Sequence, residues 1–311
     1  MRGTAPPSRG TSSRHASHTI AAEAFDTVAR VSVIEERQFH ARAVAVNYAQ
    51  LGTGVPIVLL HGGSSRWQSL EELVHGLADL GCVRAPDLRG HGLSGHLPGR
   101  YRLSDYADDL VEFLGSCTGP ARVFGHSLGG QVAIVAASQR PDLFQALAIG
   151  DAPIALPSHR RRTLRDRPML SVWRDLSASG RSRAEIAHAL RDLWVPDLEG
   201  RSGRAGDLIP ASSPWFEFMA GCLGDLDPTM LDAVLEFDEM YAAYDADRLL
   251  PAISCPVLLV RSDPAYGSGL SEEDLALAEG LLRDARAVRI AQAGHAGYVG
   301  KITGDLREFF A

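Results

Sequence analysis

The sequence lacks three features that would each assign the protein to a particular class. No apolar run approaches the eighteen or so residues that a membrane-spanning helix needs, so no membrane segment is predicted. Basic residues are not in excess, and the formal net charge of -7 provides no electrostatic footprint for nucleic acid or for an anionic membrane. No internal repeat occurs, so no repeat architecture is indicated.

Cysteine is scarce, and its spacing is not that of metal ligands. We interpret the four cysteines as free thiols in a reducing compartment, which favours a cytoplasmic location. A secreted protein with a disulfide is the alternative. The four residues are Cys82, Cys117, Cys222 and Cys255.

Lysine is nearly absent, since Lys301 is the only lysine among 31 basic residues. Residues 1–17 are rich in Arg, Ser, Thr, Gly and Pro and contain no acidic residue. An organelle transit peptide has this bias, but no apolar segment of a secretory signal is present. The lysine scarcity favours a high-GC coding bias instead, and residues 1–30 are predicted to form a disordered N-terminal extension.

Most of the remaining chain alternates strand patterns with helix patterns. Residues 31–50 resemble an antiparallel hairpin at a sheet edge, and single helices separate the strands that follow. This order predicts an α/β protein with a mostly parallel central sheet and helices on both faces. The expected strands are 56–60, 82–86, 121–125, 145–150 and 286–292, with a further buried strand from 256, and the expected helices are 67–80, 104–117, 128–139, 271–283 and 301–310.

A G-x-S-x-G motif in residues 125–130 carries the most chemical information. It follows the apolar run 121–124 and precedes an Ala-rich helix, and its glycines permit a sharp strand-to-helix turn that exposes Ser127. The helix N-terminus favours a developing oxyanion at this position. We predict that Ser127 is a nucleophile, provided that a base and an acid lie nearby.

The base follows almost by elimination. Only His159, His188 and His295 come after Ser127, and only His295 lies just past a predicted strand. For the acid, Asp263 ends the continuous apolar run 256–262, at the carboxyl end of a strand where parallel sheets carry functional groups. Asp151, which ends the strand 146–150, is the alternative.

The chain order Ser127, Asp263, His295 is similar to that of the α/β-hydrolase superfamily. Residues 56–63 resemble its strand and His-Gly-x oxyanion loop, and residues 87–94 resemble its D-x-R-G-x-G-x-S segment. The resemblance implies an oxyanion hole formed by the backbone N–H groups of Gly63 and Leu128. A serine at position 127 argues against the dehalogenase and epoxide-hydrolase branches, which have aspartate there.

The resemblance also implies a helical cap where the strand pattern stops. Residues 152–250 show no convincing strand, so we expect a hydrolase core over 31–151 and 251–311 with the cap inserted between. Apolar cap residues would favour a small, largely apolar substrate, although each also suits the cap's own core. An arginine among residues 160–167 that binds a substrate carboxylate is a further alternative. The candidate lining residues are Trp173, Trp215, Phe218, Met219 and Tyr241.

The motifs together predict a serine hydrolase of carboxylic esters or lactones that acts through an acyl-enzyme. A carbon–carbon bond hydrolase of diketone-type substrates and a cofactor-free perhydrolase are the alternatives among enzymes. A small-ligand receptor on the same fold is the alternative outside catalysis. The mechanism requires no metal or organic cofactor. We expect a small-molecule substrate and neither nucleic acid nor membrane as partner, and leave a homodimer open.

Overall fold

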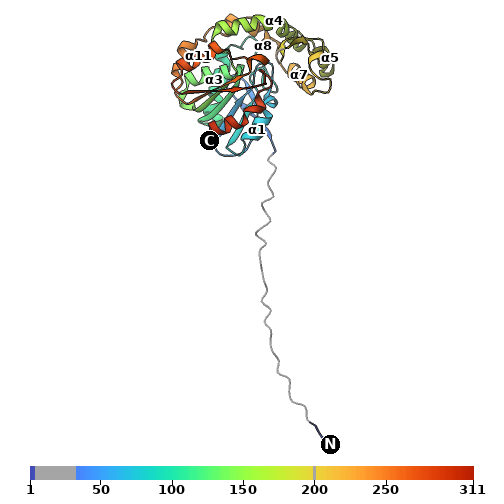
Figure 1. The fold of residues 1–311 in the computed structure, drawn as a ribbon, viewed down its shortest axis with the longest axis vertical. Coiled ribbons are helices and arrows are strands. Elements are labelled where there is room, and N and C mark those ends of the chain that lie inside the picture. Colours follow the sequence, from blue (N-terminus) through green and yellow to red (C-terminus); the bar gives the residue numbers. More distant parts are fainter. Residues whose placement is uncertain (4–32, 199–200) are drawn as a thin grey trace. The chain divides into compact units, whose positions relative to one another are not determined.

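We describe a computed structural model in which residues 1–3, 33–198 and 201–311 are placed (Figure 1). The chain divides into two units, Met1–Ser32 and Val33–Ala311. Residues 4–30 of the predicted extension lie outside the described residues. The described strands and helices all lie in the second unit.

An eight-stranded sheet forms the centre of this unit, in the order β1-β2-β4-β3-β5-β6-β9-β10. β2 pairs antiparallel with β1 and β4, and all other neighbours are parallel. The predicted fold class, a mostly parallel sheet that begins with an antiparallel edge hairpin, is confirmed. The strands are β1 (Glu35–His40), β2 (Ala45–Leu51), β3 (Pro56–Leu60), β4 (Cys82–Pro86), β5 (Ala121–His126), β6 (Phe144–Gly150), β9 (Val257–Ser262) and β10 (Ala285–Ile290).

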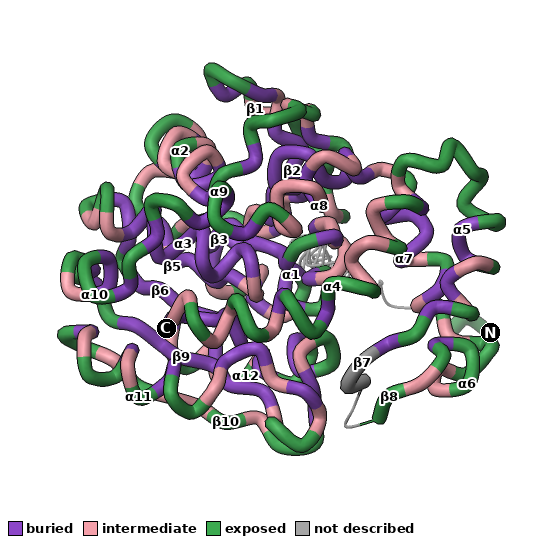
Figure 2. Tube along the Cα trace, turned by 90° about the horizontal axis from the view of Figure 1, so that it is seen from above, coloured by how far each residue is buried: buried purple, intermediate pink, exposed green. Residues whose placement is uncertain are grey.

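Helices cover both faces of the sheet because the central strands are apolar on both sides. In β3, Val58 and Leu60 enter one buried cluster and Ile57 and Leu59 enter the other, as the two-residue period of a strand requires. Figure 2 shows these central strands as the most buried part of the molecule. One face carries α2 (Leu103–Phe113), α3 (Leu128–Gln139) and α11 (Glu272–Leu281), and the other carries α1 (Glu71–Leu77) and α12 (Thr303–Phe310).

The segment between β6 and β9 is mainly helical, but it contains two strands that the sequence did not lead us to expect. β7 (Trp194–Leu198) and β8 (Arg201–Arg204) pair as an antiparallel hairpin. They are short and contain a proline and a glycine, so they show no alternation of apolar and polar residues. The helices are α4 (Leu156–Ala178), α5 (Arg183–Leu190), α6 (Ala205–Leu208), α7 (Trp215–Gly224), α8 (Pro228–Leu235), α9 (Phe237–Met240) and α10 (Ala246–Leu249).

None of the helices in the described part of the chain combines the length and the apolar character needed to cross a bilayer.

Candidate active site

Ser127 lies on a very sharp turn between β5 and α3. Its backbone φ of 51° is in the left-handed region, which costs a non-glycine residue about 1–3 kcal/mol. The neighbouring glycines explain how the turn is accommodated. A Cβ atom at Gly125 would lie 2.3 Å from the Gly129 carbonyl oxygen, and one at Gly129 would lie 2.6 Å from that of Leu60. The backbones of β5, α3 and β3 therefore approach one another too closely for any side chain at these positions.

The structure brings Ser127 and His295 together. His295 follows β10, and its Nε2 lies 3.0 Å from Ser127 Oγ. Its Nδ1 lies 2.7 Å from a carboxylate oxygen of Asp151, the residue directly after β6. The three side chains come from the carboxyl ends of three strands in one sheet, and they form a continuous chain of hydrogen bonds.

The expectation that Asp263 pairs with His295 is wrong. The Asp263 carboxylate accepts hydrogen bonds from the backbone N–H groups of Ala265 and Gln292, at 3.0 and 2.9 Å. It thus begins the Asp-Pro turn after β9 and ties that turn to the end of β10. Because β6 and β9 are neighbours, with Gly150 beside Val260, both aspartates reach the same edge of the sheet. Asp151, the alternative, is the one that faces the imidazole.

Asp151 is fully buried and almost completely enclosed by donors. Burial by itself would raise its pKa, but the hydrogen bonds from His295, Ser268 and Gly269 hold the pKa of Asp151 well below its ordinary value. The carboxylate is therefore ionised at neutral pH. Besides His295, the donors are Ser262 N and Oγ, Ser268 Oγ, Gly269 N and Leu270 N, at 2.7–3.2 Å.

This carboxylate determines the protonation state of His295. An ionised carboxylate only accepts, so His295 Nδ1 carries the proton and Nε2 presents its lone pair to the Ser127 hydroxyl. Burial of the ring and the positive charge of Arg162 lower the pKa of His295, against the opposing effect of Asp151. The imidazole is neutral at pH 7, as a general base must be.

The predicted oxyanion residues lie side by side near Ser127. A Cβ atom built at Gly63 would lie 3.8 Å from a methyl group of Leu128. Neither the Gly63 N–H nor the Leu128 N–H donates a hydrogen bond within residues 33–198 and 201–311. Two amide donors near the nucleophile are therefore available to an oxygen of a bound molecule.

Three further histidines around the site, two of them buried, have structural roles. His61 Nε2 accepts a hydrogen bond from Leu88 N, and His91 Nε2 accepts one from Ser64 N, which holds the two loops beside Ser127. Burial lowers the pKa of His61 to about 4 and that of His91 to about 3, so both are neutral. His126 packs its ring 4.8 Å from that of His295, measured between centroids.

Of the five candidate lining residues, Tyr241 contacts the helix that carries the nucleophile. Its hydroxyl donates to Gln131 Oε1 at 3.1 Å, and the Gln131 N–H donates to the carbonyl oxygen of Ser127. Met219 and Tyr241 are buried. Trp173, Trp215 and Phe218 are half-buried and pack against the larger apolar cluster, which includes residues between β6 and β9, with Phe218 beneath the Arg66 guanidinium.

The sequence did not single out three polar residues that the structure places around the triad. Gln131 lies one turn after Ser127 on α3, and His159 and Arg162 lie on α4. In the sequence, His159 does not follow a predicted strand, and Arg162 is one of several arginines in residues 160–167. The spacing of three residues between them was the available signal, since it places both on one helix face.

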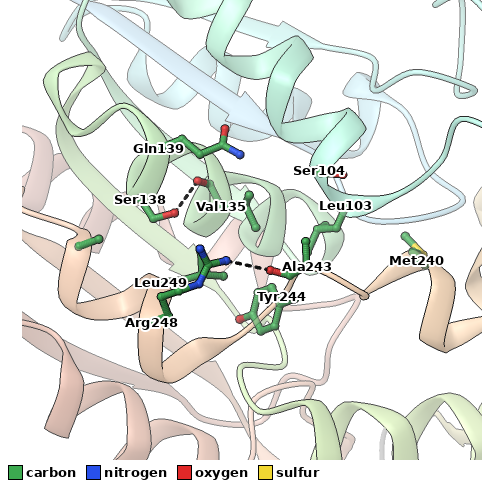
Figure 3. A pocket seen from close by; sticks show the side chains of 11 residues that line it. Leu103, Ser104, Val135, Ser138, Gln139, Met240, Ala243, Tyr244, Arg248 and Leu249 are labelled. Atoms are coloured by element: carbon green, nitrogen blue, oxygen red, sulfur yellow. Dashed lines mark hydrogen bonds between the residues drawn. The ribbon is translucent and has the colours of Figure 1, made fainter.

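A separate cavity of about 320 Å³ lies farther along α3 (Figure 3). Val135, Ser138 and Gln139 line it from α3, and Tyr244 and Arg248 line it from the segment around α10. Val135 is two turns beyond Ser127, so this cavity is distinct from the space at the triad.

The fold and the site together define a class of α/β proteins that carry a Ser-His-Asp arrangement at the carboxyl edge of a mostly parallel sheet. Residues 57–300 match the family described as the alpha/beta hydrolase family, and the chain belongs to that family. The resemblance inferred from the motifs is confirmed.

Relatives with assigned names match only parts of the chain. It is 34% identical over 109 residues to a 2-(acetamidomethylene)succinate hydrolase of Mesorhizobium japonicum, a match that covers 35% of this chain and 39% of that protein. It is 29% identical over 205 residues to the lipase LipV of Mycobacterium tuberculosis, covering 65% of this chain and 64% of that protein. The matches therefore span from about two fifths to less than two thirds of these relatives.

Solved structures share the fold over most of the chain. A hydrolase from Pseudomonas aeruginosa superimposes with a TM-score of 0.68 and 20% sequence identity, covering 89% of this chain and 98% of that one. An E-2-(acetamidomethylene)succinate hydrolase superimposes with a TM-score of 0.67 and 20% identity, covering 89% and 99%. At this level of identity the likeness concerns the fold alone.

Proposed function

We propose that this protein is a serine hydrolase that cleaves a carboxylic ester or lactone of a small substrate through an acyl-enzyme. The observation that carries the proposal is the chain of hydrogen bonds from Ser127 Oγ to His295, 3.0 Å, and from His295 to Asp151, 2.7 Å. A serine hydroxyl is a weak nucleophile until a positioned base accepts its proton, and a third group must orient that base. The nucleophile, the base and the orienting acid follow three separate strands of the sheet.

The reaction proceeds in two half-reactions. Ser127 Oγ attacks the carbonyl carbon while His295 Nε2 takes its proton, and Asp151 stabilises the imidazolium that forms. The tetrahedral oxyanion accepts hydrogen bonds from the N–H groups of Gly63 and Leu128, each worth about 3–4 kcal/mol in the transition state. His295 then protonates the leaving alkoxide. Water, deprotonated by the same imidazole, releases the acyl group and restores Ser127.

The similarity to LipV over 65% of the chain supports ester hydrolysis as the first choice. The similarity to the 2-(acetamidomethylene)succinate hydrolase over 35% of the chain keeps other acyl substrates as a second choice. Hydrolysis of a carbon–carbon bond in a diketone-type substrate and perhydrolysis remain alternatives, because they would use the same serine, histidine and oxyanion donors. A receptor with an inactive triad is the alternative outside catalysis.

The test combines labelling with turnover. A fluorophosphonate probe should label the wild-type protein and fail to label Ser127→Ala, since the reagent requires an activated serine. A panel of p-nitrophenyl esters of increasing chain length, with lactones and diketones beside them, then identifies the substrate class. Labelling without ester or lactone turnover would favour the carbon–carbon hydrolase. Absence of labelling would favour the receptor, and unchanged ester turnover in Ser127→Ala would refute the assignment.

A further inference from the structure

Two polar side chains of α4 lie beside the triad without taking part in it. His159 Nδ1 is 3.0 Å from the side-chain nitrogen of Gln131, the residue one turn after Ser127. Three residues farther along α4, Arg162 Nη1 donates to the Ser268 carbonyl oxygen at 2.8 Å. Residues three apart lie one above the other on a helix, so one face of α4 presents both side chains.

The hydrogen bonds of Gln131 determine which nitrogen of His159 carries the proton. The Gln131 Nε2 group donates to the Pro153 carbonyl oxygen at 3.1 Å, and Oε1 accepts from the Tyr241 hydroxyl. These two partners fix the amide orientation, so His159 Nδ1 faces an N–H donor and must accept. Burial lowers the pKa of His159 to about 3, and the ring is neutral with its proton on Nε2.

The Nε2–H group of His159 belongs to a half-buried side chain. It makes no hydrogen bond within the described residues, and it is not among their fully buried unpartnered atoms. Besides burial, Arg162 and His295 lower the pKa of His159, so both side chains lie close to its ring. The side chains of both Arg162 and His295 are 22% exposed, so a bound molecule can reach this region.

Arg162 is the cationic group of α4 that most affects His295. Arg162 contacts Asp166, with Nε 3.6 Å from a carboxylate oxygen. Even so, Arg162 lowers the pKa of His295 more than Asp166 raises it. The pair therefore acts on His295 as a net positive charge. The first turns of α4 add the partial positive charge of a helix N-terminus.

We propose that His159 and Arg162 form a subsite for a carboxylate of the substrate, so that the protein acts on half-esters of small dicarboxylic acids or on carboxylate-bearing lactones. This inference rests on the proposed hydrolase function and names its substrate class. The guanidinium supplies the charge, and the His159 Nε2–H supplies a donor whose direction Gln131 holds fixed. The apolar cap residues would then contact the hydrocarbon part of the substrate.

A purely structural role for Arg162 is the competing explanation. Ser268, whose carbonyl oxygen accepts from Arg162, donates its own hydroxyl to Asp151 at 2.7 Å. Loss of Arg162 could therefore disturb the triad for every substrate. A comparison of charged and neutral substrates separates the two roles, because a disturbed triad lowers both rates together.

The experiment compares methyl hydrogen glutarate with methyl hexanoate, measured by pH-stat at about pH 8, where histidine is neutral. Wild-type kcat/KM should be higher for the half-ester. In Arg162→Gln the ratio of the two kcat/KM values should fall about tenfold to a hundredfold, mainly through KM, as for loss of a hydrogen bond to a charged group. His159→Phe should lower the ratio in the same direction.

Arg161→Gln is the matched control. Arg161 is the preceding residue on α4, is 66% exposed and pairs with Glu273, so its loss should leave the ratio unchanged. A wild-type protein that prefers the neutral ester would overturn the inference. An equal fall for both substrates in Arg162→Gln would overturn it as well.

A binding measurement separates failure of the subsite from failure of the proposed function. Ser127→Ala should bind methyl hydrogen glutarate in calorimetry, and Ser127→Ala combined with Arg162→Gln should bind it at least tenfold more weakly. Binding without ester turnover or fluorophosphonate labelling of the wild type would support the subsite while refuting the hydrolase. Ester turnover without carboxylate preference or binding would refute the subsite alone.

Discussion

Replacing Asp151 by Asn tests the assignment of the triad acid most directly. Asparagine keeps the shape of the side chain but turns one acceptor oxygen into a donor. In the native structure one carboxylate oxygen accepts from Ser262 N, Ser268 Oγ and Leu270 N, and the other accepts from Ser262 Oγ, Gly269 N and His295 Nδ1.

Either orientation of the amide leaves at least one backbone N–H facing another donor. With the NH₂ group toward His295, the Gly269 N–H loses its acceptor, while the hydroxyl of Ser262 can rotate to accept. One buried unsatisfied donor costs about 1–3 kcal/mol of folding free energy. The imidazole must then accept at Nδ1, so that its proton moves to Nε2, where it faces Ser127 and cannot act as a base.

The expected result is a fall in kcat of about 10⁴-fold in a protein that remains folded. The assay is p-nitrophenyl ester hydrolysis, with circular dichroism and a urea melt to show that the variant retains its structure. Asp263→Asn is the control, because Asp263 only caps a turn. It should keep kcat within about twofold and lose at most about 1 kcal/mol of stability. A large loss in Asp263→Asn combined with near-normal Asp151→Asn would refute the reasoning.

Two further predictions concern pH dependence and the elbow. Burial and Arg162 lower the pKa of His295 below its ordinary 6.5, so kcat/KM for a neutral ester should persist below pH 6.5 and fall as the pH drops through that lowered pKa. Arg162→Gln should move the midpoint of this profile to higher pH. An unmoved midpoint would contradict the electrostatic effect of Arg162 on His295. Gly125→Ala should lose about 3 kcal/mol or more in a urea melt, because its methyl group would lie 2.3 Å from the Gly129 carbonyl oxygen. Gly115→Ala, where a Cβ meets nothing within 4 Å, is the control, and equal stability of the two variants would count against the close packing of the elbow.

The sheet and its helices could be predicted because their signals are local. An apolar run such as that of β3, the Ala-rich pattern of α3 and the glycines around Ser127 each constrain the backbone within a few residues. Their order along the chain then limits the topology, since single-helix crossovers produce neighbouring parallel strands. The β7–β8 hairpin escaped prediction because its strands are short and do not alternate apolar and polar residues, and pairing between them stabilises what their composition does not indicate.

The roles of His159 and Gln131 could not be read from the sequence for a different reason. Their hydrogen bond joins α4 to α3 across 28 positions, and its meaning depends on Tyr241, which lies 110 positions from Gln131. No local pattern encodes how the segment between β6 and β9 packs against the rest of the protein. The same holds for the contact of Arg162 with Ser268, which determines that this arginine, among its neighbours on α4, acts on the triad.

The sequence by itself determined the parallel sheet, the turn at Ser127 and the choice of His295, because each depends on residues adjacent in the chain or on the order of strands. Only the tertiary structure decided between Asp151 and Asp263. Both follow neighbouring strands at the same edge of the sheet, so periodicity treats them alike. The choice of Asp151 as the triad acid depends on the loop at residues 268–270. Gly269 allows the backbone of this loop to pack closely against Asp151 and His295, since a Cβ atom there would lie 2.6 Å from His295 Nδ1. Long-range packing of that loop supplies the hydrogen-bond donors that keep Asp151 ionised beside His295. Asp263, in contrast, caps a turn.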